Sequence, residues 1–130
     1  MNNSNPKIFI SFFLILLVTN ITCGNRTQQK EPVLISEEAY SPKTICDCND
    51  DGMNILNDIL TKRKEFETIE LLTANEKASK HISLLKKNWK TTQYKCLRLF
   101  GPALLGPTEC NQPKKIQSIK DQLFDLGVRT

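Results

Sequence analysis

An apolar run near the start of the chain, interrupted only by Ser11, indicates the compartment in which the rest must fold. It extends from Ile8 to Val18, with Lys7 before it and small or polar residues from Thr19 to Gly24 after it. This pattern is typical of a secretory signal peptide, and the run is too short to span a bilayer as a helix. We therefore expect residues 1–24 to be removed, leaving a secreted chain of about 106 residues that does not insert into a membrane.

Four cysteines remain in the expected mature chain, and in an oxidising compartment they predict two disulfides. They are Cys46, Cys48, Cys96 and Cys110. The first two are too close to pair comfortably with each other, so each is expected to bond to one of the last two, in an order that the sequence leaves open. Zinc is not expected, because the spacing lacks paired knuckles. Cleavage before Cys23 would add an odd thiol.

Residues 25–45 show no helical period, contain two prolines and begin with the sequon Asn25-Arg26-Thr27. A sequon in a secreted protein predicts an exposed site, so we expect glycosylation at Asn25 on a flexible N-terminal segment. The organised domain is then expected over residues 46–130.

Apolar residues recur at helical spacing in four stretches of that domain, which predicts an all-α fold. In the first stretch Met53, Leu56 and Leu60 share a face that ends at the basic residues Lys62–Lys64. The second should begin with a capping box of Thr73 and Glu76 and bury a stripe that runs to Trp89. That stripe consists of Ala78, Ile82, Leu85 and Trp89.

The third expected helix is short, with Tyr94, Leu97 and Phe100 on one face, and Gly101-Pro102 should end it. The fourth should open at Pro113 and end at Gly127. It would bury Ile116, Ile119, Leu123 and Leu126.

Two long connections lie between these helices, and both are expected to be extended. Phe66–Leu72 alternates like a strand, and Ala103–Cys110 is broken by glycine and proline. The two segments would be able to pair as a short two-stranded ribbon. Long crossovers of this kind are typical of a short-chain four-helix bundle with up-up-down-down topology.

The layout resembles the interleukin-4/interleukin-13 family of secreted cytokines. The resemblance covers Cys46 to Leu126 and rests on five features. These are Cys46-Asp47 at the first helix, the segment Glu67-Thr68-Ile69-Glu70-Leu71, a cysteine in the third helix, a cysteine before the fourth, and Ile119-Lys120-Asp121-Gln122-Leu123-Phe124. It implies a ligand for class I cytokine receptor chains, acting as a monomer and without catalysis.

The same resemblance implies where a receptor would bind. Members of the family hold their first receptor chain with acidic and polar residues of the first helix and basic residues of the third. The matching candidates here are Asp51, Asn54, Asp58, Lys95 and Arg98. The alternative is that they are ordinary polar residues on helix surfaces.

The formal charge of +4 is modest and does not demand a nucleic-acid partner. Between Glu76 and Phe100, however, seven residues are basic and only Glu76 is acidic. Such a stretch is either a solvated helix face or a patch that steers an acidic receptor.

One alternative is a secreted helical binding module of another kind that holds calcium. Asp47, Asn49, Asp51 and Asp58 match ligand positions of an EF-hand loop, although the closing residue is not glutamate. These residues would otherwise cap the first helix. No enzyme is expected, since His81 is the only histidine and no catalytic motif accompanies it. No metal or other cofactor is therefore expected.

Overall fold

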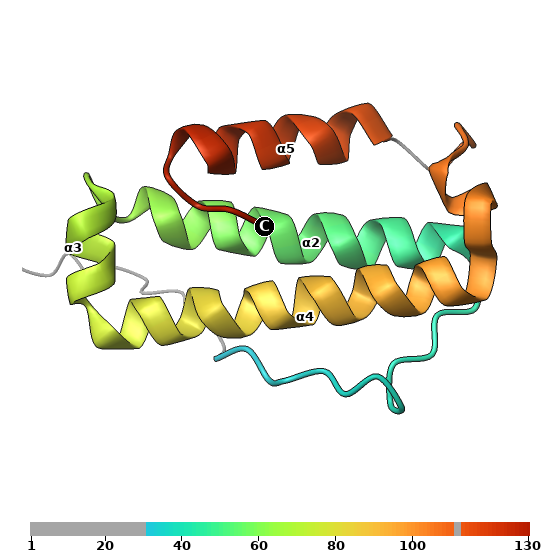
Figure 1. Ribbon diagram of the computed structural model, residues 1–130, viewed down its shortest axis with the longest axis horizontal. Coiled ribbons are helices and arrows are strands. Elements are labelled where there is room, and N and C mark those ends of the chain that lie inside the picture. Colours follow the sequence, from blue (N-terminus) through green and yellow to red (C-terminus); the bar gives the residue numbers. More distant parts are fainter. Residues whose placement is uncertain (1–30, 111–112) are drawn as a thin grey trace, which may run out of the picture. The chain divides into compact units, whose positions relative to one another are not determined.

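The computed structural model describes residues 31–110 and 113–130. They form α2 (Ile45–Lys64), α3 (Ile69–Ala74), α4 (Glu76–Phe100), the 3₁₀ helix η1 (Gly101–Leu105) and α5 (Pro113–Asp125), as Figure 1 shows. The all-α prediction is confirmed, and no strand occurs among the described residues. Within the same residues, no helix combines the length and hydropathy needed to cross a bilayer.

Helix α2 contains the first predicted helix and begins earlier than the apolar pattern indicated. Thr44 caps it: the Thr44 hydroxyl accepts the backbone N–H of Asp47, and the Asp47 carboxylate accepts the backbone N–H of Thr44. This reciprocal pair is a capping box, which satisfies two amides that the helix leaves free. The early start places both Cys46 and Cys48 on the helix.

Helix α4 replaces two predicted helices with one continuous helix. The predicted stripe is confirmed, because its four residues from Ala78 to Trp89 are buried, and Thr92 and Cys96 extend it. Residues 90–93 contain no glycine or proline, so nothing in them stops the helix. Leu97 and Tyr94 are half exposed and do not form the core face expected of a separate third helix. Gly101, with φ 54°, ends the helix as expected.

The predicted capping box at Thr73 and Glu76 is wrong. Thr73 belongs to α3, where its hydroxyl donates to the backbone O of Ile69. The N-cap of α4 is Asn75, whose side-chain oxygen accepts the backbone N–H of Ala78. An Asn one residue before the helix supplies the acceptor that the first turn needs, so Thr73 is not required.

Both predicted extended connections are partly helical instead, since α3 begins at Ile69 and η1 ends at Leu105, and the two-stranded ribbon is not present among the described residues. Thr68 caps α3 by accepting the backbone N–H of Leu71, and Leu72 is buried against the core. In the second connection Pro102 lies in the first turn of η1. Short segments with a cap or an early proline form local helical hydrogen bonds more readily than unpaired strands.

Helix α5 opens at Pro113 as predicted and is followed by Gly127 at φ 81°. Of the four residues predicted to be buried, Ile119 and Leu123 are buried, whereas Ile116 and Leu126 are only partly buried. Figure 1 shows α2 and α4 side by side in opposite directions, and α5 lies along α2. Three long helices therefore follow one another in alternating directions. The four-helix up-up-down-down bundle is not confirmed, because its second and third helices are the single helix α4.

Helices α2 and α4 approach each other closely at one glycine. Gly52 of α2 lies against the ring of Trp89 of α4, and only a residue without Cβ fits there. Leu56 and Ile59 of α2 and Leu123 of α5 are fully buried in the core. At the other end of α2, the buried Arg63 donates to the backbone oxygens of Phe66 and Leu126. Those bonds fasten the ends of α2 and α5 together.

Two disulfides fix one end of α2 to distant parts of the chain. Cys46 bonds to Cys110 and Cys48 to Cys96, with Cα–Cα distances of 5.1 and 6.0 Å. The prediction that neither of the first two cysteines pairs with the other is confirmed. The expected leader 1–24, Cys23 and the sequon at Asn25 lie outside the described residues.

Candidate functional site

The described part of the N-terminal segment, residues 31–44, lies along α4 and is held there by a buried amide (Figure 1). Asn88 of α4 is 4% exposed. Its side chain accepts the backbone N–H of Ile35 and donates to the backbone O of Val33, both at 2.9 Å. The sequence predicted a flexible segment to residue 45, whereas these two bonds attach residues 33–35 to the helix.

Tyr40 makes the second attachment, this time to α2. Its hydroxyl donates to the carboxylate of Asp51 at 2.9 Å and lies 3.8 Å from the sulfur of Cys96. Burial, together with the hydrogen bond to Asp51, raises the pKa of Tyr40 above its ordinary value. The phenol therefore stays protonated and remains a donor at physiological pH.

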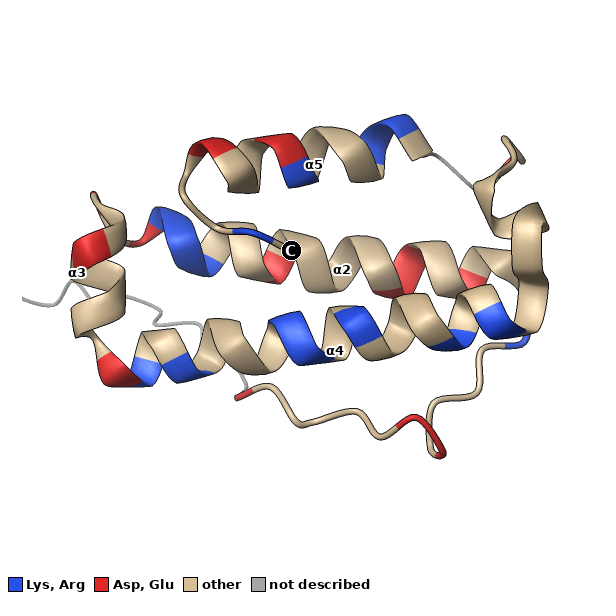
Figure 2. Ribbon diagram, viewed as in Figure 1, with Lys and Arg blue, Asp and Glu red and all other residues tan. Residues whose placement is uncertain are grey.

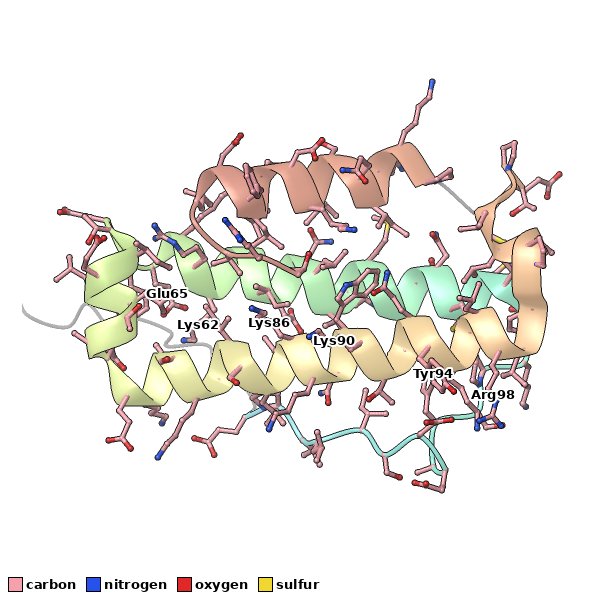
Figure 3. The ribbon with its side chains drawn as sticks, viewed as in Figure 1. Lys62, Glu65, Lys86, Lys90, Tyr94 and Arg98 are labelled. Atoms are coloured by element: carbon pink, nitrogen blue, oxygen red, sulfur yellow. A yellow bond between two sulfur atoms is a disulfide. The ribbon has the colours of Figure 1, made fainter. Side chains whose placement is uncertain are left out.

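Glu37 makes the third attachment, to the last turns of α4. Lys95 donates to the backbone O of Glu37 at 3.0 Å, and Arg98 donates to its carboxylate at 2.8 Å. Figure 3 shows Arg98 at the end of α4 beside this segment. The two basic residues predicted to meet a receptor are thus already bonded within the molecule, and the carboxylate of Glu37 offsets part of the charge of Arg98.

The three acidic and polar candidates of α2 lie on one face that borders the same segment. Asp51, Asn54 and Asp58 line a hollow of about 550 Å³ between α2 and residues 34–40. Asn54 and Asp58 are exposed. All five predicted contact residues therefore border the N-terminal segment, but in two groups: three line the hollow and two bind Glu37.

Two exposed apolar side chains of the N-terminal segment were missed by sequence reasoning. Val33 is 75% exposed, and Leu34, which lines the hollow, is 57% exposed. The tripeptide Val33-Leu34-Ile35 is an apolar run inside a polar segment. This run was the sequence feature that could have indicated an attached, partly apolar segment. We call the surface formed by Val33, Leu34, Tyr40, Asp51, Asn54 and Asp58 the N-terminal face.

The calcium alternative does not fit the structure. Residues 47–58 lie within α2, so the irregular loop that an EF-hand requires is not formed. Bonds from the backbone N–H groups of Lys43 and Thr44 lower the pKa of Asp47, which acts as a helix cap. Asn49 is buried and donates to the backbone O of Cys110. No cluster of three potential metal ligands occurs in residues 31–110 and 113–130.

The basic residues of α4 divide into two sets, which Figure 2 shows along the helix. Towards its ends they have partners: Lys77 pairs with Glu31, Lys80 with Glu76 and Arg98 with Glu37, and Lys95 donates to the backbone O of Glu37. In the middle, three lysines make no ion pair with any described residue. They are Lys86, Lys87 and Lys90. The expected basic patch is therefore concentrated at mid-helix.

Comparison with known proteins gives no further guide to the site. No family model matches the sequence, and no similar curated protein or solved structure is found.

Proposed function

We propose that this protein is a secreted helical cytokine of interleukin-4/interleukin-13 type that acts by binding class I cytokine receptor chains at the cell surface. The observation that carries the proposal is the N-terminal face, where exposed Leu34, next in sequence to exposed Val33, lines a hollow together with Asp51, Asn54 and Asp58. Two disulfides in a small helical domain are consistent with an extracellular protein.

The composition of this face suits a protein partner. Binding energy at protein interfaces is concentrated in a few apolar side chains that become fully buried, while a polar rim supplies specificity. Leu34 would be the apolar anchor, and the carboxylates of Asp51 and Asp58 would form the rim. A complementary receptor surface would present an apolar pocket edged by basic residues.

Three attachments support the idea that the face is preformed. The side chains of Asn88, Tyr40 and Glu37 hold residues 33–40 on α2 and α4. A segment ordered before binding loses less conformational entropy when its partner arrives. The continuous α4 departs from the family layout, so the proposal concerns the class of partner and does not depend on four separate helices.

Binding of fluorescently labelled protein to leukocytes of the source organism tests the proposal. Leu34→Asp should weaken saturable binding at least about tenfold, because it puts a charge where an apolar anchor would be buried. Leu105→Asp is a matched control, since Leu105 is 72% exposed and lies outside the N-terminal face. Equal binding by both variants and the wild type would exclude the N-terminal face as the receptor contact. No saturable binding by the wild type would exclude a cell-surface receptor on those cells.

A further inference from the structure

A second surface, on another side of α4, has different chemistry. A cleft of about 420 Å³ lies between α4, α3 and residues 127–129. Its polar lining consists of three hydroxyls and four cations: Thr73, Ser79, Ser83, Lys86, Lys87, Lys90 and Arg129. No aspartate or glutamate lines it. We call it the basic cleft, and Figure 3 shows two of its lysines, Lys86 and Lys90, on α4.

The positive charge in the basic cleft is not balanced within the described residues. Lys86, Lys87 and Lys90 make no ion pair there, in contrast to the lysines nearer the start of the helix. Lys86 and Lys90 are one turn apart, and like charges at that spacing repel and destabilise a helix. An anion bound between them and Arg129 would relieve that repulsion.

The lining of the cleft distinguishes among classes of anionic partner. None of the exposed large apolar side chains of the described residues lines it. Of its larger apolar residues, Leu72 and Val128 are buried and Ile69 is partly buried. A protein partner would require exposed apolar anchors, and a membrane surface would require side chains that enter the lipid. No aromatic residue lines the cleft, so it has no stacking platform for single-stranded nucleic acid.

We propose that the basic cleft binds a sulfated glycosaminoglycan chain. Lysine ammonium groups act as compact point charges for sulfate oxygens, and the hydroxyls of Ser79 and Ser83 can donate to the same oxygens or to sugar hydroxyls. The Thr73 hydroxyl donates its hydrogen to the backbone O of Ile69, so it can only accept from a sugar hydroxyl. The proposal uses the extracellular location argued above but not the receptor. The cleft and the N-terminal face have no lining residue in common.

Heparin affinity chromatography on the disulfide-bonded protein is the test. The wild type should be retained at about 0.15 M salt, and Lys87→Glu with Lys90→Glu should lower its affinity at least about tenfold, because binding releases counterions for each cation engaged. Lys114→Glu with Lys115→Glu changes the net charge equally and alters two exposed lysines of α5 outside the cleft. This control should elute close to the wild type.

Three results would overturn the proposal: passage of the wild type through the column at that salt, equal loss in both double variants, or equal competition by unsulfated hyaluronan. Circular dichroism should show unchanged helicity in each variant. Lys90→Gln with Arg129→Gln removes charge without introducing repulsion and should give a smaller loss. The N-terminal face variant Leu34→Asp should bind heparin like the wild type, so failure of the receptor proposal can be distinguished from failure of this one.

Discussion

Replacing Gly52 by alanine should destabilise the protein, although alanine is normally the better helix residue. A Cβ at position 52 would lie 2.8 Å from Cζ3 of Trp89, closer than carbon atoms normally approach. Trp89 is only 4% exposed, so its ring has little room to move away. Overpacking of this kind costs about 1–3 kcal/mol. The helix-propensity gain of about 1 kcal/mol offsets part of that cost.

The expected net loss of unfolding free energy is therefore about 1 kcal/mol, or a fall of about 4–8 °C in Tm for a domain of this size. Urea denaturation followed by circular dichroism measures it. In the Trp89→Phe background the ring atom nearest position 52 is absent, and Gly52→Ala should become neutral or stabilising by up to about 1 kcal/mol. Asn57→Ala, at an exposed position of α2, should have the same small stabilising effect in both backgrounds.

The interpretation of the α2–α4 contact would be refuted if Gly52→Ala stabilised the wild type as much as it stabilises the Trp89→Phe protein. Equal effects would mean that the two positions are not coupled. The glycine would then have no packing role.

Three further substitutions test two attachments of the N-terminal segment and the effect of burial on the pKa of His81. Asn88→Ala should lower the unfolding free energy by about 1–3 kcal/mol and accelerate amide exchange at Ile35, because both bonds to the segment are lost; unchanged exchange would contradict the attachment. Tyr40→Phe should cost about 0.5–1.5 kcal/mol at neutral pH. Because the pKa of Tyr40 is raised on folding, the unfolded chain ionises first, and stability should fall above about pH 10 in the wild type more than in the variant. Burial and nearby Lys62 lower the pKa of His81. The unfolded state therefore binds a proton first as the pH drops, so stability should fall below about pH 6.5. His81→Gln should reduce that fall, and identical pH profiles of stability for the variant and the wild type would contradict the role of His81.

Sequence periodicity correctly predicted buried residues where a helix presents one long apolar stripe to the core. Leu56 and Leu60 of α2, and Ile119 and Leu123 of α5, are buried as their spacing predicts. Gly127 marks the end of α5 as expected, because its φ of 81° suits a residue without Cβ. The disulfide partners also followed from the closeness of the first two cysteines, although their order needed the structure.

Other features depended on contacts that periodicity does not encode. Phe66–Leu72 alternates like a strand, but the Thr68 cap makes its second half a helix. The core stripe of α4 continues past Trp89 through Thr92, a polar residue that is 1% exposed and that an apolar pattern does not mark as core. The N-terminal segment is fixed by Asn88 and Tyr40, which bond to residues 11 to 55 positions away. Such long-range polar bonds leave no pattern in the local sequence.

The most direct test of the central claim is STAT phosphorylation in leukocytes of the source organism, treated with folded, disulfide-bonded protein. A class I receptor ligand should raise phosphorylation in a saturable way. Leu34→Asp should require at least about tenfold more protein for the same response, while Leu105→Asp should match the wild type. No phosphorylation at a saturating concentration of the wild type, or equal potency of the Leu34→Asp variant, would contradict receptor engagement through the N-terminal face.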